Sequence, residues 1–294
     1  MILKRLKAFL ERTLFRGLSD EIVLKLYYRI FIGRKLNLKT PRGYNEKLQW
    51  LKLHDRNTEY CQLVDKYQAK KIAARMIGEE YIVPIIAGPW KCVEEIEIEK
   101  LPNQFVLKTS HDCGGIVICR DKKLFDWDKA KKKLKKCLKT NYYFVGREWP
   151  YKNISPCIFA EQYLDSSDES GLIDYKFMCF GGEPKVMFTV SERNTNMKVD
   201  FFNMDFQHLS IVRHYPNSTR EITRPDCFEQ MKKLARVLAK SYPHVRIDFY
   251  EHEGKIYFGE WTFYPGSGFE KFDSYDDDLL LGELISIGNF EESS

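Results

Sequence analysis

The chain lacks the sequence features that mark several common classes of protein. No run of about 18 apolar residues is present, so no segment is expected to span a bilayer, and the N-terminus is too charged for a signal peptide. The eight cysteines include no CxxC pair, which argues against a zinc site or a disulfide framework and favours a reducing, cytoplasmic compartment. The 47 basic and 42 acidic residues are dispersed, so the net charge of +5 does not indicate a nucleic-acid partner.

What the chain does have is enough apolar sequence for a large core. With 294 residues, 44% of them hydrophobic and 14% aromatic, we expect two or three lobes around a cleft. The first quarter of the chain is predicted to be mostly helical, and one helix is expected to start at Pro41 with Thr40 as its cap. Strand-like and helical segments then alternate without repeats, which predicts an α/β or α+β class.

Apolar and basic residues alternate at helical spacing in the N-terminal segment. Four leucines fall along one helical face: Leu3, Leu6, Leu10 and Leu14. The cations lie largely elsewhere: Lys4, Arg5, Lys7, Arg12 and Arg16. Such a helix can make a weak peripheral contact with an anionic membrane surface, or it can dock on its own domain with a solvated basic face. The sequence leaves both interpretations open.

Residues 103–120 read NQFVLKTSHDCGGIVICR, in which a lone lysine ends an apolar run. Lys108 is followed by a short loop with Gly114 and Gly115, which permit a close approach of the backbone to a ligand. A lysine before such a loop suits the binding of a phosphate, but the same pattern also fits an ordinary hairpin. The lysine precedes the glycines, so this is not a Walker A motif.

Near the other end of the chain, VRIDFYEHEGKIYFGEWTF is predicted to form a β-hairpin. A three-residue loop, His252 to Gly254, would place Asp248 opposite Phe258 and Arg246 opposite Glu260. These residues and Thr262 would then share one face, whereas an even loop would put the two carboxylates on opposite faces. Two carboxylates beside an arginine suit magnesium, but a cross-strand ion pair explains the spacing equally well.

Taken in order, several motifs resemble the ATP-grasp superfamily, as seen in D-alanine:D-alanine ligase and biotin carboxylase. They are VDKYQAK, FVLKTSHDCGG, FAEQYL, and VRIDFY followed by GKIYFGEWTFYPG. A narrower resemblance, over roughly residues 35–275, is to the TupA-like ATP-grasp family, named for teichuronopeptide biosynthesis. It rests on NLKTPRGYNEKLQWLKLHD, GREWPYKNI and GEWTFYPGSGFEKF.

The resemblance implies an α+β fold, the ATP-grasp fold, in which two α+β lobes grip ATP behind a helical N-terminal extension. It implies a helical N-terminal region over residues 1–62, a central lid lobe over residues 63–162 and a C-terminal lobe over residues 163–294.

The resemblance also implies roles for residues in the first of these lobes. Lys66 matches the phosphate-binding lysine, Lys70 would assist it, and Lys108 matches the lysine under the glycine-rich lid of Gly114 and Gly115. In that lid His111 either touches a phosphate or serves as an ordinary polar loop residue. The interdomain hinge, whose backbone would meet the adenine edge, is Glu161, Gln162, Tyr163 and Leu164.

In the C-terminal lobe the resemblance points to metal and substrate contacts. Asp174 matches a ribose partner, Asp248 and Glu260 match carboxylates that bind magnesium, and Arg246 matches a catalytic arginine that stabilises the acyl phosphate. Where the ligases usually have an asparagine two residues after the glutamate, this chain has Thr262. A threonine hydroxyl is a weaker magnesium ligand, which puts a second metal ion in doubt.

The implied activity is that of a carboxylate-amine ligase using ATP and Mg²⁺. A carboxylate, from a small molecule or a glycan, attacks ATP to give an acyl phosphate, and an amine then displaces phosphate to form an amide. The resemblance places this in bacterial surface polysaccharide synthesis, in the cytoplasm or at the inner face of the membrane. Two rivals stay open: a glycosyltransferase that uses the acidic run 276–278 as a DxD-type motif, and a nucleotide-binding module without turnover.

Overall fold

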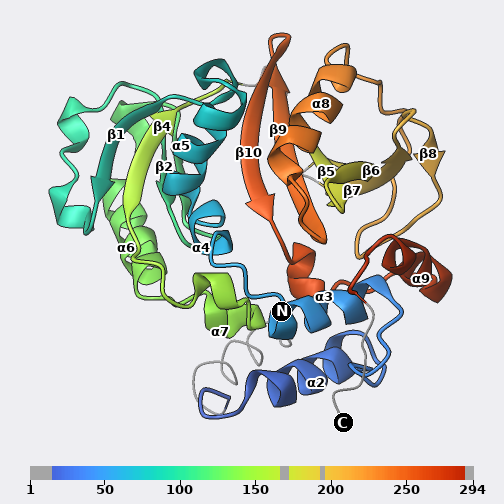
Figure 1. Ribbon diagram of the computed structural model, residues 1–294. Coiled ribbons are helices and arrows are strands. Elements are labelled where there is room, and N and C mark those ends of the chain that lie inside the picture. Colours follow the sequence, from blue (N-terminus) through green and yellow to red (C-terminus); the bar gives the residue numbers. More distant parts are fainter. Residues whose placement is uncertain (1–14, 166–171, 193–195, 289–294) are drawn as a thin grey trace. The chain divides into compact units, whose positions relative to one another are not determined.

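In the computed structural model, which describes residues 15–165, 172–192 and 196–288, the chain divides into two compact units (Figure 1). One unit is residues 58–167, and the other combines residues 1–57 with residues 168–294. We call them the middle unit and the split unit. The predicted domain boundaries at residues 62 and 162 stay a prediction. The predicted amphipathic segment 1–14 lies outside the described residues.

The middle unit is built on a four-stranded antiparallel sheet in the order β1-β4-β2-β3. Its strands are β1 (Ile85–Trp90), β2 (Phe105–Thr109), β3 (Ile116–Cys119) and β4 (Ile158–Gln162). Its α-helices are α4 (Tyr60–Leu63), α5 (Lys66–Ile77), α6 (Trp127–Leu138) and α7 (Tyr143–Gly146). Five short 3₁₀ helices join them: η1 (Glu79–Tyr81), η2 (Val93–Glu95), η3 (Ile98–Lys100), η4 (Lys122–Leu124) and η5 (Trp149–Tyr151).

Alternation along β2 and β4 assigns each face of this sheet to a different helix. Phe105 and Leu107 point to one face, where they form a core with Ala160 of β4 and Leu134 of α6. Phe159 points to the other face and packs against Tyr67 of α5, with 5.5 Å between ring centroids. Lys108 of β2 and Glu161 of β4 point to this second face as well, so helix α5 covers the face on which both charged side chains lie.

The split unit is built on a six-stranded antiparallel sheet in the order β10-β9-β5-β6-β7-β8. Its strands are β5 (Asp174–Phe180), β6 (Glu183–Ser191), β7 (Lys198–Asn203), β8 (His208–Leu209), β9 (His244–His252) and β10 (Lys255–Thr262). Its helices are α2 (Asp20–Phe31), α3 (Tyr44–His54), α8 (Phe228–Ala239), η6 (Pro265–Gly268) and α9 (Tyr275–Glu283).

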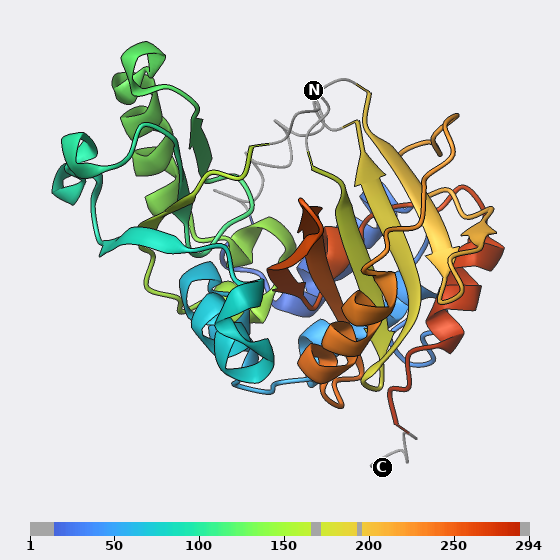
Figure 2. The ribbon, with the colours of Figure 1, turned by 90° about the horizontal axis from the view of Figure 1, so that it is seen from above.

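Helix α8 lies against one face of the larger sheet, as Figure 2 shows. Phe228 of α8 stacks on Phe177 of β5 at 5.7 Å, and the indole of Trp261 in β10 donates to the Leu238 carbonyl at 3.0 Å. Phe249 of β9 also packs against Phe177, so Phe177, Phe249 and Trp261 occupy one face of β5, β9 and β10. Their sequence neighbours Lys176, Asp248 and Glu260 occupy the other face, which carries the charge.

Helix α3 begins later than the sequence predicts. It starts at Tyr44, with Gly43 before it, and not at Pro41. The Thr40 hydroxyl instead accepts a hydrogen bond from the side chain of Asn37, whereas the backbone N–H of Asn45 donates to the carboxylate of Asp278 in α9 at 3.0 Å. A carboxylate distant in sequence thus satisfies a donor at the start of this helix, because the N–H groups of a first turn have no partner within the helix.

Candidate functional site

Lys108 is the penultimate residue of β2, and its side chain pairs with a buried carboxylate. Its Nζ lies 2.6 Å from Glu161 Oε2, and Lys70 Nζ from helix α5 lies 3.0 Å from the other oxygen, Oε1. Glu161 is 1% exposed, Lys70 is 4% exposed, and the Lys108 side chain is 23% exposed. Two lysines therefore share one glutamate, and the positive charge of Lys108 is the one that reaches solvent.

The electrostatics of this Lys70–Glu161–Lys108 triad follow from its burial. Burial favours the neutral form of Glu161, but the two ammonium groups outweigh it and hold the pKa of the carboxyl below its usual range. Burial lowers the pKa of Lys70, against the opposing effect of Glu161. One carboxylate cannot neutralise two cations, so the triad keeps an excess of positive charge beside the partly exposed lysine.

The loop after Lys108 is held together by Asp112. Its carboxylate accepts hydrogen bonds from the Thr109 hydroxyl and from the backbone N–H of Gly115 at 2.9 Å. A Cβ on Gly115 would lie 1.6 Å from Thr109 Oγ1, so this position requires glycine, whereas a Cβ on Gly114 would meet nothing within 4 Å. Of the two glycines predicted to face a phosphate, one is thus required by packing inside the loop.

Two other predicted phosphate contacts also lie at this loop. Lys66 is the first residue of α5, and its Nζ donates to the backbone carbonyl of Asp112. His111 is buried, and its Nε2–H donates to the carbonyl of Cys137 in the last turn of α6 at 3.2 Å and to that of Thr140, just after the helix, at 3.0 Å. These contacts favour the interpretation of His111 as a loop residue, and its contact with a phosphate stays a prediction.

The predicted hinge begins inside strand β4. Gln162 donates its backbone N–H to the Pro84 carbonyl at 2.9 Å, and Glu161 pairs with neighbours in both adjacent strands. Tyr163 and Leu164 follow the end of the strand. The sequence does not predict that the Glu161 side chain pairs with Lys70 and Lys108. The contact of this segment with adenine stays a prediction.

In the split unit, the loop of the β9–β10 hairpin differs from the prediction. His252 pairs with Lys255, so the loop has two residues, Glu253 and Gly254, and not three. Both have positive φ, 52° and 74°, as two-residue type I′ turns require. An even loop alone would place Asp248 and Glu260 on opposite faces of the sheet.

A β-bulge restores the common face. Phe258 pairs with Phe249 but Trp261 pairs with Ile247, so Gly259 and Glu260 both stand opposite the single residue Asp248. The extra residue reverses the alternation after the bulge, which brings Glu260 to the face of Asp248. The predicted grouping of Arg246, Asp248, Glu260 and Thr262 is confirmed, but the loop that was expected to produce it is wrong.

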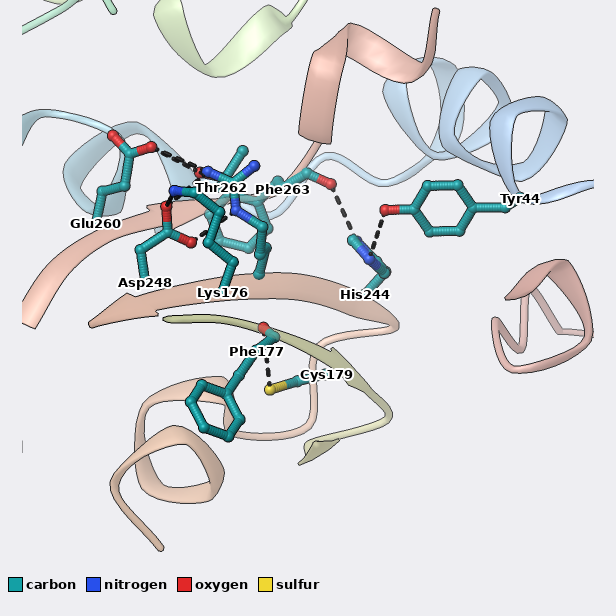
Figure 3. A network of polar contacts seen from close by, with 10 residues as sticks. Tyr44, Lys176, Phe177, Cys179, His244, Asp248, Glu260, Thr262 and Phe263 are labelled. Carbon is teal, nitrogen blue, oxygen red and sulfur yellow. Dashed lines mark hydrogen bonds and ion pairs between the residues drawn. The ribbon is translucent and has the colours of Figure 1, made fainter. Parts of the chain in front are cut away.

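Arg246 is the centre of this grouping, and its partners Asp248, Glu260 and Thr262 are labelled in Figure 3. Its Nε donates to Asp248 Oδ1 at 2.6 Å, and its Nη2 donates to Asp248 Oδ2 at 2.7 Å, to Glu260 Oε1 at 3.1 Å and to Thr262 Oγ1 at 3.0 Å. Lys176 from β5, the partner of Asp248 in strand register, places its Nζ on Asp248 Oδ2 as a second cation. Lys176 is not among the residues that the sequence predicts for this site.

These residues carry their charges in a buried setting. Burial alone would raise the pKa of Asp248, but Arg246 and Lys176 hold the pKa of this carboxyl below its usual value. Burial lowers the pKa of Lys176, although Asp248 opposes that effect. Asp248 is 1% exposed, whereas the Glu260 side chain is 34% exposed, so Glu260 is the carboxylate within reach of an incoming ligand.

The donor set suits magnesium only if substrate supplies further ligands. Among the described residues there is no group of three or more His, Cys, Asp or Glu side chains that could hold a metal ion. Magnesium prefers hard oxygen ligands and is often bound by one or two carboxylates, with phosphate oxygens and waters completing its shell. Glu260 and Asp248 fit that pattern, although both oxygens of Asp248 already face cations.

Two further predicted residues have clear positions in the split unit. Asp174 is buried in β5, two residues before Lys176 and therefore on the same face of the sheet. The acidic run 276–278 lies in the first turn of α9, where Ser274 accepts a hydrogen bond from Asp276 N. Burial raises the pKa of Asp278 to about 6. The acidic run thus begins a helix and does not follow a strand end.

The chain belongs to the TupA-like ATPgrasp family, whose pattern matches residues 46–286. This confirms the ATP-grasp fold, and the antiparallel sheets with their covering helices confirm the α+β class. No curated protein matches the chain.

Several solved structures are similar to it at low identity. D-alanine–D-alanine ligase from Bacillus anthracis, complexed with ATP, is 16% identical; the match covers 84% of this chain and 64% of that chain, with a TM-score of 0.39. L-amino acid ligase from Bacillus licheniformis is 13% identical; the match covers 85% of this chain and 57% of that chain, with a TM-score of 0.43. Carboxyaminoimidazole ribonucleotide synthase from Aspergillus clavatus, complexed with ATP, is 12% identical; the match covers 69% of this chain and 45% of that chain, with a TM-score of 0.40. The chain thus spans less than two thirds of the length of each of these three proteins.

Proposed function

We propose that the protein is an ATP-dependent carboxylate-amine ligase that forms an amide through an acyl phosphate. The observation that carries the proposal is the gathering of Arg246, Lys176, Asp248 and Glu260 on one sheet face of a chain that belongs to an ATP-grasp family. A surface ion pair would not require two buried cations on a single aspartate. Phosphoryl transfer, by contrast, depends on closely placed cations and carboxylates.

Each charged group would have a distinct part in the reaction. Lys108 shares the single negative charge of Glu161 with Lys70, so it would be available to bind phosphate oxygens of ATP. Lys66 would assist it. Arg246 and Lys176 would stabilise the negative charge that develops when the substrate carboxylate attacks the γ-phosphate and ADP leaves. Asp248 would hold both cations in place, because it bonds to each of them.

Glu260, together with Asp248 and the Thr262 hydroxyl, would hold magnesium. The ion would neutralise phosphate charge when bound. An amine would then attack the acyl carbon and displace phosphate, which forms the amide. The hinge from Glu161 to Leu164 and the ribose contact of Asp174 belong to the same proposal and rest on the family resemblance alone.

The substrates and setting are also proposals. By its family, the protein would act in the cytoplasm on a uronic acid or an acidic amino acid destined for a bacterial surface polysaccharide. Neither rival function gains support from the site. The acidic run that a glycosyltransferase would need lies in the first turn of α9, and Asp278 within it accepts a hydrogen bond from Asn45.

The test is release of ADP and phosphate from Mg-ATP in the presence of paired carboxylates and amines. Glu260→Gln keeps the size of the side chain but removes one negative charge, so it should lower the turnover rate by about 10²- to 10³-fold. Glu183→Gln is the matched control, because Glu183 pairs with Arg236 at an exposed site of the same unit. This control variant should turn over ATP at the wild-type rate.

Binding is tested separately by heating the protein with and without Mg-ATP. Ligand at about 100 times its dissociation constant should stabilise the native state by about 2.7 kcal/mol. Full activity of Glu260→Gln would contradict the assignment of this site. Stabilisation by a sugar nucleotide and not by ATP would contradict the ligase and favour the glycosyltransferase.

A further inference from the structure

Helix α2 has apolar side chains on its solvent face as well as on its core face. Its inner residues Val23, Leu24, Tyr27 and Tyr28 are at most 1% exposed and pack with Phe15, Ile32, Leu36 and Phe269. On the outer side, the exposed fractions are 37% for Leu18, 48% for Ile22, 41% for Leu26 and 49% for Ile30. We call these four residues the α2 stripe.

The stripe is not the usual scatter of apolar side chains on a surface. Single exposed leucines and isoleucines are common and need no explanation. Here four of the ten large hydrophobic residues that are exposed in the described part of the chain lie on one helix and its N-terminal flank. They recur at every fourth position, which aligns them along one side of a helix.

Cations accompany the stripe. Lys25 and Arg29 are exposed, and the 100° advance per residue places both beside Ile22 and Leu26. Lys25 pairs with Glu21, and Arg16 lies exposed just before the stripe. An apolar strip bordered by Lys and Arg is typical of helices that lie in the plane of an anionic bilayer surface.

The distribution of charge along the sequence points the same way. Residues 1–35 contain nine Lys or Arg against three Asp or Glu, an excess larger than the net +5 of the whole chain. The remaining residues are therefore close to neutral overall, and positive charge is concentrated in the segment that carries the stripe. Basic segments of this kind are attracted to anionic lipid headgroups within a Debye length of the surface.

We propose that the α2 stripe, with Arg16, Lys25 and Arg29, docks the protein on the surface of an anionic phospholipid bilayer. The helix is already fixed by its inner face, so docking would not require it to fold. The stripe would enter the interface between headgroups and acyl chains, while the cations meet phosphate groups. The contact is peripheral, because none of the described helices combines the length and the apolar character that a membrane crossing needs.

The experiment measures co-sedimentation of the full chain with vesicles. Vesicles of phosphatidylcholine and phosphatidylglycerol in equal parts should bind the protein at low salt, and vesicles of phosphatidylcholine alone should bind it at least tenfold more weakly, since each cation near the surface contributes about fivefold. The triple variant Ile22→Ser, Leu26→Ser, Ile30→Ser should lose at least about tenfold in partition, because its apolar contact is removed.

A matched control removes exposed apolar side chains elsewhere on the same unit. Val237 in α8 and Leu280 in α9 are 49% and 53% exposed, so the double variant Val237→Ser, Leu280→Ser should bind vesicles like wild type. Lys25→Gln with Arg29→Gln should weaken binding to anionic vesicles and change the unfolding midpoint little, because the Lys25–Glu21 pair is exposed.

Three outcomes would overturn the proposal. They are equal partition of the triple variant and wild type, equal binding to neutral and anionic vesicles, and a wild-type dimer that the triple variant converts to monomer in the absence of lipid. The last would show that a second copy of the chain covers the stripe.

Discussion

Replacing Glu161 with glutamine tests whether the buried triad stabilises the middle unit. The substitution keeps the size of the side chain and leaves one acceptor oxygen, but it removes the charge between Lys70 and Lys108 and turns an NH₂ group toward one of them. Lys108 can move toward solvent, because its side chain is 23% exposed, whereas Lys70 is 4% exposed. Most of the loss should therefore fall on Lys70, which becomes a buried cation without its counter-charge.

The magnitude follows from that burial. Removing one partner of a buried ion pair typically destabilises a protein by about 3–5 kcal/mol, because it leaves a desolvated charge behind. We expect the Glu161→Gln variant to lose about 3 kcal/mol of unfolding free energy at neutral pH. Burial lowers the pKa of Lys70 below 10.5, so the folded variant binds this proton less tightly than the unfolded chain. Part of the lost stability should therefore return as the pH rises toward 10.5.

Urea unfolding measures the loss, and hydrogen exchange of peptides covering β4 assigns it to the middle unit. Adding Lys70→Met to Glu161→Gln should recover at least half of the stability, because an apolar side chain leaves no buried charge. Glu97→Gln serves as control, since Glu97 and Lys100 form an exposed pair whose side chains are 65% and 74% exposed, and we expect no measurable change. Wild-type stability of Glu161→Gln, or no recovery in the double variant, would refute the reasoning.

Two further predictions concern single positions. Burial lowers the pKa of His244 to about 3, so the unfolded chain takes up a proton below pH 6.5 that the folded chain does not, and stability should fall with pH in this range by up to about 1.4 kcal/mol per unit. His244→Gln should lose that part of the pH dependence in urea unfolding at about pH 7 and pH 5, and an unchanged dependence would contradict the burial argument. Gly115→Ala should destabilise the lid loop by about 1–3 kcal/mol in thermal unfolding, because the new Cβ would overlap Thr109 Oγ1. Gly114→Ala has open space and should be tolerated, and equal effects of the two substitutions would rule out the steric explanation.

Periodicity in the sequence was sufficient to predict several elements of the fold. The segment 127–139 forms α6 over Trp127–Leu138, with Ala130 and Leu134 buried and its lysines mainly outside, because a stripe at helical spacing decides which face is buried. The start of α3 was not predictable in this way. Asn45 N donates to Asp278, 233 residues further along the chain, and no local pattern carries that information.

In the candidate site, too, the local sequence indicates which residues are unusual but does not indicate their partners, which lie far away in the sequence. The lysine at the end of an apolar strand indicated an unusual environment for Lys108, since a buried charge needs a partner. For the partner itself, Glu161, the motif predicts a place in the hinge, and no motif marks Lys176 within the strand KFMCF. Both are charged residues inside otherwise apolar strands, which is the signal that could have identified them as members of buried ion pairs.

The bulge in β10 explains how a correct grouping came from an incorrect loop. Side-chain alternation depends only on the parity of the residues between two positions, so a three-residue loop and a two-residue loop followed by a one-residue bulge give the same result. The two arrangements differ in where the irregularity lies. With the bulge, it lies at Gly259 and Glu260, opposite Asp248, and a Cβ on Gly259 would lie 3.0 Å from the Tyr250 ring and 3.1 Å from the Asp248 carbonyl oxygen. The sequence places a glycine where the strand must approach its neighbour closely, and the next residue is the carboxylate that the bulge turns toward Arg246.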